Sequence, residues 1–148
     1  MRRILVAVDG STASKRAATF VESFFRGDDV AITAVNVAHN PVPWLAPVPF
    51  GAVYTWPYGP ADQEVLDQAL AEEEAEATAV AAEVAPADAE VEVVFGETVE
   101  AILKAADDED VDLVVVGHSG KGFLGRLLEG SVSERVTRAS TRPVLVVP

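Results

Sequence analysis

The chain has 148 residues, 24 of them acidic and 11 basic, so its formal charge at pH 7 is -13. This length fits one domain, and an apolar fraction of 49% excludes a disordered tail. The chain has no cysteine and two histidines, which excludes disulfides, cysteine nucleophiles and a three-histidine zinc site. A protein with this much negative charge repels nucleic acid and anionic membrane surfaces, so neither is expected as a partner.

The first element in chain order is the short apolar run Ile4–Val8, which stops at Asp9. A secretory signal needs an apolar core of about 7 to 15 residues and a membrane span about 20, so we expect neither and predict a cytoplasmic protein. We interpret the run as a buried strand, followed by a helix from Thr12 to about Phe25. The apolar face of this helix is expected to hold Ala17, Phe20, Val21, Phe24 and Phe25.

A second strand is predicted at Val30–Val37, where nearly every residue is apolar and Asn36 is the only strongly polar one. Residues 38–60 then hold six of the nine prolines, both tryptophans and both tyrosines. Because proline removes backbone donors, this segment is predicted to be a loop insertion within a domain that spans 1–148. Two interpretations stay open: a surface loop or linker that packs on itself, and a functional lid or subunit contact.

The rest of the chain alternates between helical and strand patterns. Helices are predicted at 61–85, 97–106 and 131–139, and strands at 90–95, 112–116 and 143–147. The long first helix of this series has Val65, Leu66, Ala69, Leu70, Ala77, Val80 and Val84 at helical spacing. Five strands alternating with four helices predict an α/β fold around a parallel sheet.

Charge is distributed unevenly, because the interval between Arg26 and Lys104 holds fifteen carboxylates and no lysine or arginine. One interpretation is an acidic interaction surface, but the solvent face of a sheet-covering helix accounts for the pattern better. The acidic bias also suggests, as a hypothesis, a halophile whose salt-rich cytoplasm screens the self-repulsion of the surface.

The glycine-rich segment from Gly117 to Ser131 follows a predicted strand and precedes a predicted helix. Glycines let backbone amides approach an anion, and a helix start adds unpaired donors, so phosphate is the expected ligand. Lys121 and Arg126 add positive charge to this segment. The alternative is a merely flexible strand-to-helix connection.

Three familiar motifs fail on this segment. A Walker A loop needs Lys-Ser/Thr after its last glycine, but Phe123 follows Gly122. The glycine spacing of a Rossmann fingerprint starts at Gly120, but this segment does not follow the first strand. Leu145 also stands at the position where the fingerprint needs an acidic residue for the ribose. A hydrolase nucleophile elbow at Ser119 would need a later histidine, and none follows.

A fourth pattern fits. Gly117-x-x-Gly120, nine residues and then Gly130-Ser131 resembles the ATP-binding signature of the universal stress protein family, and Ile4–Ser11 and Pro143–Val147 resemble its first and last strands. The resemblance covers essentially all 148 residues. It implies a single three-layer domain with a five-stranded parallel sheet in the order 3-2-1-4-5 and four helices, and a homodimer through the last strand.

The resemblance also implies a nucleotide site across the carboxyl ends of the first and fourth strands. Asp9 would contact the ribose, or the triphosphate through a Mg²⁺ ion, although a turn or cap role for it stays open. The other residues implied in nucleotide binding are Ala7, Val37, Val116, Gly117, His118, Ser119, Gly120, Gly130, Ser131, Val132 and Ser133. His39 and His118 are otherwise interpreted as polar loop residues.

The expected function is that of an ATP-binding module in regulation or stress response, with ATP as ligand. Neither a general base nor an ordered set of charges for phosphoryl transfer is evident, so at most slow ATP hydrolysis is expected. The alternative is a structural, partner-binding protein of the same fold in which the glycines only shape a loop. The sequence does not distinguish ATP from AMP, nor does it identify the process that is regulated.

Overall fold

A computed structural model describes residues 1–25, 27, 29–39, 60–118 and 131–148, without the side chains of 60–63. It contains a five-stranded, all-parallel sheet in the order β3-β2-β1-β4-β5. The predicted α/β class and strand order are therefore confirmed. The strands are β1 (Arg2–Ala7), β2 (Val30–Ala38), β3 (Glu90–Phe95), β4 (Leu113–Gly117) and β5 (Val144–Val147).

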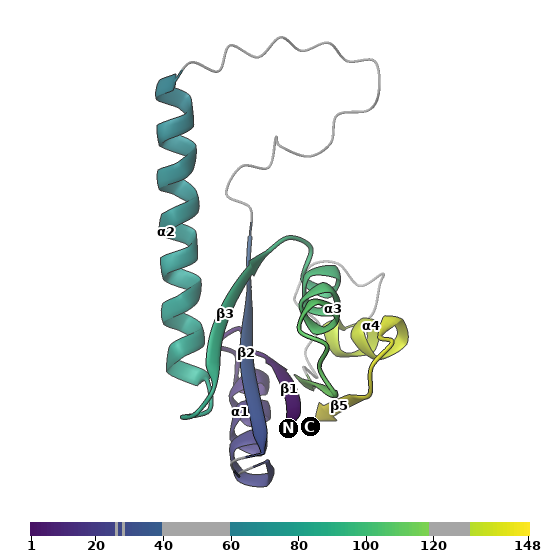
Figure 1. Ribbon diagram of the computed structural model, residues 1–148. Helices are drawn as coiled ribbons and strands as arrows, with labels where there is room; N and C mark the ends of the chain where they lie inside the picture. Colours follow the sequence, from purple (N-terminus) through teal and green to yellow (C-terminus); the bar gives the residue numbers. More distant parts are fainter. Residues whose placement is uncertain (26, 28, 40–59, 119–130) are drawn as a thin grey trace.

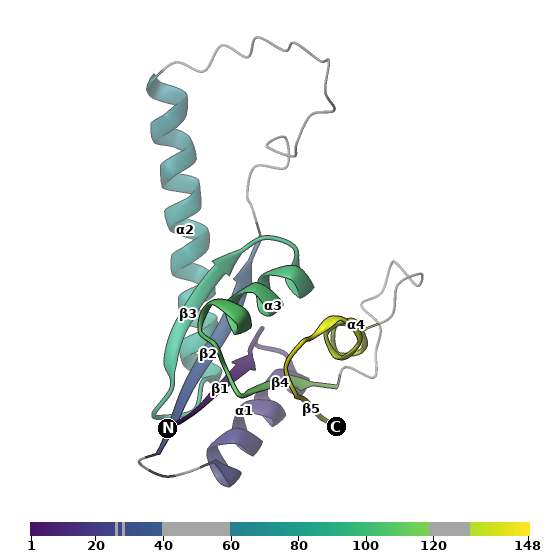
Figure 2. The same cartoon turned by 45° about the vertical axis from the view of Figure 1, so that its right-hand side comes forward.

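Four helices connect these strands and cover both faces of the sheet (Figure 1). They are α1 (Thr12–Phe24), α2 (Pro60–Val84), α3 (Thr98–Asp108) and α4 (Val132–Ala139). Figure 2 shows α3 and α4 on the side of the sheet away from α1. Every predicted element is present, and its bounds differ by no more than two residues from those expected, the usual uncertainty of element ends.

The strands are apolar on both sides because each face of the sheet packs on a helix pair. On one face Val6 and Val115 pack with Val21 of α1 and Ala81 of α2. On the other face Leu5 and Val114 belong to a second cluster, together with Val99 and Ile102 of α3 and Val136 of α4. This burial on both faces explains the continuous apolar runs of the parallel strands.

Two expectations about helix faces are wrong. Phe24 was assigned to the buried face of α1, but it is 71% exposed and stacks on Phe20 with ring centroids 4.3 Å apart. Val65 was assigned to the apolar face of α2 and is 68% exposed. Figure 1 shows why: α2 is longer than the sheet it covers, so only its carboxyl-terminal part packs, through residues such as Ala77 and Ala81.

Within the described ranges, no helix combines the length and apolar character needed to cross a membrane. The segment 40–59, which carries most of the predicted aromatic and proline-rich loop, lies outside the described residues, as do Ser119, Gly120 and Gly130 of the predicted phosphate loop.

Candidate functional site

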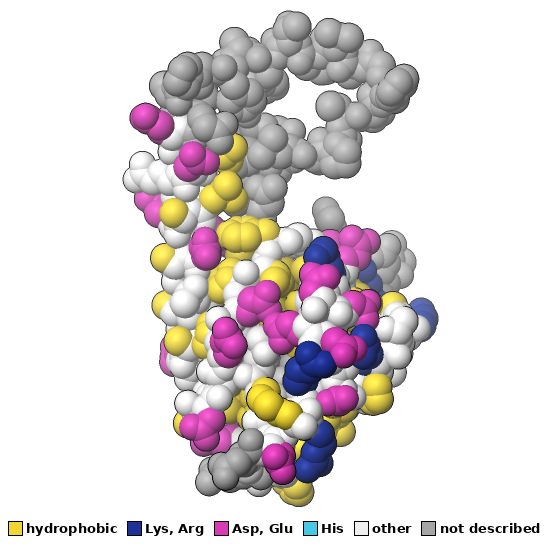
Figure 3. Space-filling model, in the orientation of Figure 1, with side chains coloured by type: hydrophobic (Ala, Val, Ile, Leu, Met, Phe, Trp, Pro, Cys, Tyr) yellow, Lys and Arg dark blue, Asp and Glu magenta, His cyan; other side chains and the backbone are white. Residues whose placement is uncertain are grey.

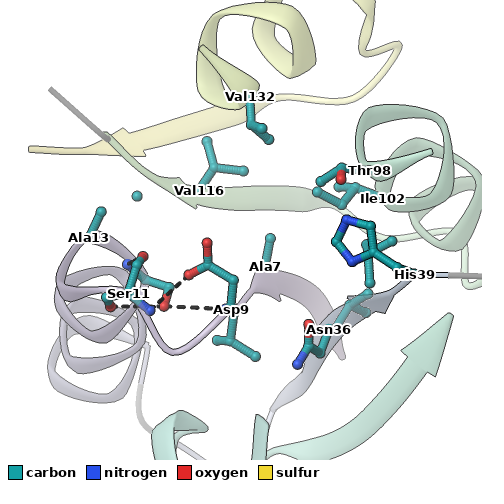
Figure 4. A pocket seen from close by; sticks show the side chains of 15 residues that line it. Ala7, Asp9, Ser11, Ala13, Asn36, His39, Thr98, Ile102, Val116 and Val132 are labelled. Atoms are coloured by element: carbon teal, nitrogen blue, oxygen red, sulfur yellow. Dashed lines mark hydrogen bonds between the residues drawn. The ribbon is translucent and has the colours of Figure 1, made fainter. Parts of the chain in front are cut away.

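A cavity of about 340 Å³ opens at the carboxyl ends of the strands, where β1 lies between β2 and β4 and the strand order reverses. Open α/β sheets bind ligands at this point, because the connections leave it in opposite directions. Figure 4 shows the cavity from close by. Its lining comes from the strand ends and from the starts of α1, α3 and α4: Ala7, Val8, Asp9, Ser11, Ala13, Ser14, Val35, Asn36, Val37, His39, Thr98, Ile102, Val116, Gly117 and Val132.

The turn between β1 and α1 holds Asp9 at the cavity. Asp9 Oδ1 accepts a hydrogen bond from the backbone N–H of Ser11 at 3.0 Å, and Ser11 Oγ caps α1 by accepting from Ser14 N at 3.2 Å. Gly10 between them has φ +76°, and a Cβ there would lie 3.0 Å from Cγ1 of Val80. The turn therefore requires glycine, and the carboxylate of Asp9 faces the cavity (Figure 4).

Asp9 is held in its ionised form. Burial alone would raise the pKa of its carboxyl, but the hydrogen bonds from Ser11 and Ser14 outweigh burial and lower the pKa below its ordinary value. The carboxylate thus has the turn role that the sequence left open, and it also lines the cavity. It is an anion at neutral pH and suits hydroxyl donors or a cation, not a bare phosphate.

Gly117 lets the end of β4 touch the start of α1. A Cβ at this position would lie 2.3 Å from the backbone oxygen of Ala13 and 2.9 Å from the backbone nitrogen of Ser14. No side chain fits into that space, so a glycine is needed whether or not a ligand binds. The contact brings the carboxyl end of β4 next to the turn that carries Asp9.

The backbone of β2 extends past the end of β1 at the cavity. The last paired residues of the two strands are Ala7 and Val35, and Val8 N–H donates to Val35 O at 2.8 Å. Backbone groups two residues apart in a strand point to the same side, so the N–H and C=O of Val37 face the cavity beyond the last β1 partner. Val37 therefore offers one donor and one acceptor beside an apolar floor.

The start of α4 forms the opposite rim. Ser131 is its N-cap and accepts from Glu134 N at 3.3 Å, and its hydroxyl lies 3.0 Å from that of the buried Ser133. Val132 lines the cavity. His118, by contrast, is not a lining residue, and its backbone N–H is not available to a ligand because it donates to Val147 O at 2.6 Å.

Half of the residues that the sequence nominated thus meet at one cavity: Ala7, Asp9, Val37, Val116, Gly117 and Val132. His118, Ser131 and Ser133 lie beside it without lining it. Ser119, Gly120 and Gly130 lie outside the described residues.

The structure adds lining residues that sequence reasoning missed, among them Asn36, His39, Thr98 and Ile102. His39 was interpreted as a polar loop residue, but in Figure 4 its ring lies near Thr98 and Ile102 at the end of the cavity away from Ser11. The sequence did contain one signal for Asn36. A strongly polar side chain within an apolar strand needs a hydrogen-bond partner, either in the protein or on a ligand.

The family model described as the universal stress protein family matches residues 1–148. The chain belongs to this family. Its curated relatives include a Thermus aquaticus protein named for its position in the QAH/OAS sulfhydrylase 3' region, with 34% identity over 99% of this chain and 98% of that one.

Solved structures resemble this universal stress protein over nearly its whole length. A universal stress protein in complex with cAMP is 27% identical with a TM-score of 0.59, covering 99% of this chain and 96% of the other. An Arabidopsis thaliana family member with AMP bound has a TM-score of 0.60 at 19% identity, covering 99% of this chain and 91% of the other, and this likeness supports the fold alone.

Proposed function

We propose that this universal stress protein binds ATP at the cavity beside Asp9 and acts as a nucleotide-dependent regulatory module. The observation that carries the proposal is the cavity itself. It lies where the strand order reverses, with the ionised Asp9 at one end and the apolar strand ends between β1, β2 and β4. A nucleotide has matching parts: an apolar base, a ribose with hydroxyl donors and an anionic phosphate chain.

We infer the orientation of the ligand from the two ends of the cavity. The base fits beside Val37, whose backbone donor and acceptor match the edge of adenine, and the ribose hydroxyls fit Asp9. The phosphates would then extend toward the chain that follows Gly117 and toward Ser131 at the start of α4, where unpaired amides favour anions. The similar structure with cAMP supports an adenine nucleotide as the ligand class.

Magnesium fits the same arrangement. Asp9 is the only carboxylate among the described lining residues, and Mg²⁺ in nucleotide sites is held mainly by phosphates and water with one or two carboxylates. When bound, the ion would neutralise phosphate charge, and Asp9 would hold it on the protein side. The proposal includes at most slow ATP hydrolysis, because phosphoryl transfer needs a positioned water and charge neutralisation at the transferred group.

Equilibrium dialysis with ATP, with and without Mg²⁺, tests the proposal. We expect saturable binding that weakens by about tenfold in Asp9→Ala, a loss on the scale of one charged hydrogen bond. Asp88→Ala is the matched control, because Asp88 is exposed and precedes β3 at the opposite end of the sheet. Absence of binding at millimolar ATP would overturn the assignment.

The structural, partner-binding alternative makes the opposite prediction. It requires that Gly130→Val leave ATP affinity unchanged and that deletion of residues 41–59 abolish capture of a protein partner. The nucleotide proposal requires that Gly130→Val weaken ATP binding. A branched side chain in the proposed phosphate loop would obstruct the approach of backbone amides to the phosphates.

A further inference from the structure

We propose that the side chain of Asn36 selects the base by accepting a hydrogen bond from an exocyclic amino group, so that the site prefers 6-aminopurine over 6-oxopurine nucleotides. This inference rests on the proposed nucleotide function of the same cavity. It assigns specificity to a residue that lies outside the glycine motif.

The first observation is that Asn36 is buried and polar. It is 7% exposed, lies two residues before the carboxyl end of β2 and lines the cavity. A carboxamide has two donor hydrogens and an acceptor oxygen, and leaving these groups unpaired in an interior is costly. A buried asparagine that faces a cavity is therefore a candidate for contact with the ligand.

The second observation is that one hydrogen bond sets which end of the carboxamide faces inward. Asn36 Nδ2 donates to the backbone oxygen of Ala77 in α2 at 2.9 Å. Because a carbonyl oxygen only accepts, the amide nitrogen must lie on the α2 side, and the orientation of the group follows from chemistry. Oδ1, which only accepts, is then the end left for the cavity.

The third observation is that Oδ1 has no hydrogen-bond donor among the described residues. In the view of Figure 4 the carboxamide of Asn36 lies below the side chain of Ala7, with Asp9 to one side and His39 to the other. The oxygen is thus an acceptor on the cavity side of the carboxamide, and a ligand that binds here gains most by presenting an N–H group to it.

The base edge fits this acceptor together with Val37. The 6-amino group of adenine has two hydrogens, and the neighbouring ring nitrogen is an acceptor. The carbonyl of Val37 takes one of these hydrogens and Asn36 Oδ1 the other, while the N–H of Val37 donates to the ring nitrogen. A 6-oxo group would place a third acceptor against Oδ1 and Val37 O, and the N–H of its neighbouring ring nitrogen would face the N–H of Val37.

The test compares ATP with ITP, which carries an oxygen in place of the 6-amino group. We expect the wild-type protein to bind ATP about 10-fold to 100-fold more tightly than ITP. Asn36→Ala should reduce this ratio by about tenfold, mostly by weakening ATP binding. Thr78→Val is the matched control, because Thr78 is exposed, follows Ala77 in α2 and does not line the cavity, so its loss should leave the ratio unchanged.

Circular dichroism checks that Asn36→Ala folds, since it also loses the bond to Ala77. If it does not fold, Asn36→Ser replaces it, and its hydroxyl, which both donates and accepts, should likewise reduce the preference for ATP. Equal wild-type affinities for ATP and ITP, or an unchanged ratio in the folded Asn36 variant, would overturn the inference while the proposed function stands. Failure of the wild-type protein to bind either nucleotide would overturn both.

Discussion

Glu97 and Arg135 form an ion pair, with Oε1 and Nη1 3.0 Å apart, that connects the start of α3 to α4. The other oxygen of the same carboxylate caps α3 by accepting from the backbone nitrogens of Val99 and Glu100, each at 3.0 Å. One side chain thus positions the first turn of α3, which brings Thr98 to the cavity, relative to the helix that forms the opposite rim.

Glu97→Ala is expected to lower the free energy of unfolding by about 1–2 kcal/mol, chiefly through loss of the cap, because an exposed ion pair adds little. Burial alone would raise the Glu97 pKa, but the backbone bond from Glu100 and the charge of Arg135 lower it. The stabilisation is therefore present above the unfolded pKa and is lost as pH falls through the lowered pKa. Urea titrations between pH 3 and pH 7 measure this loss.

Glu100→Ala is the matched control for this prediction. Glu100 is exposed in the same first turn and its side chain caps nothing among the described residues, so its loss should cost no more than about 0.5 kcal/mol. Equal effects of the two substitutions would show that the cap of α3 is not what Glu97 contributes.

The sequence predicts the parallel sheet well because its strands are buried on both faces and read as continuous apolar runs, such as Leu113–Val116. It fails for Phe24 and Val65 because helical spacing shows which residues share a face, not how far the sheet extends beneath that face. It overlooks Asn36 and His39 for a similar reason: their place at the cavity depends on where β1 ends and β2 continues.

Gly117→Ala is expected to destabilise the protein by about 1–3 kcal/mol, because its Cβ would overlap the backbone oxygen of Ala13 and force α1 and β4 apart. ATP affinity should fall as well, since the same contact joins the turn at Asp9 to the carboxyl end of β4. Chemical denaturation and dialysis measure the two effects. Ala87→Ser, which adds an atom at an exposed position, should change stability by less than about 0.5 kcal/mol, and a similar loss in both variants would refute the steric argument.

A carboxyl pair links the edge strand β3 to the end of α3. Thr33 Oγ1 donates to Glu109 Oε2 at 2.7 Å, and the buried Oε2 of Glu92 has no donor among the described residues. The hydrogen bond with Glu109 raises the pKa of Glu92 to about 7, assisted by burial and by the charges of Glu109, Asp108 and Glu90. Two ionised carboxylates cannot share a hydrogen bond, so the pair is bonded only while one of them is protonated.

Stability is therefore expected to fall as pH rises toward 8. The folded pKa of Glu92 lies above its ordinary value of 4.5, so its contribution is complete below pH 4.5 and is lost through pH 7. In Glu92→Gln the side-chain amide still donates toward Glu109 but does not titrate. The urea midpoint of this variant should therefore change little between pH 5 and pH 8. Glu90→Gln removes only a neighbouring charge, so its urea midpoint should still fall with pH as in the wild type. A fall of the same size in Glu92→Gln would contradict the assignment.

The last strand is an edge of the sheet, which favours pairing with a second copy. The carbonyls of Pro143 and Val147 point to β4, so the backbone of Val146 points outward. We expect light scattering at physiological salt to give twice the chain mass of 15.6 kDa, and Val146→Pro, which removes an outward N–H, to give a monomer. Val146→Thr keeps that N–H and should remain dimeric, whereas a wild-type monomer would contradict the prediction.

The acidic surface predicts that salt stabilises the fold. In Figure 3 acidic and basic side chains are interspersed over α3 and α4, whereas α2 has acidic side chains and its sequence holds no lysine or arginine. With a net charge of -13, mutual repulsion favours the expanded chain at low ionic strength, and screening relieves it. Thermal unfolding followed by circular dichroism should therefore shift to higher temperature between low and molar KCl. Because α2 itself carries no lysine or arginine, replacing Glu72 and Glu76 with glutamine should reduce this shift. Equal stability at both salt concentrations would remove the basis for a halophilic interpretation.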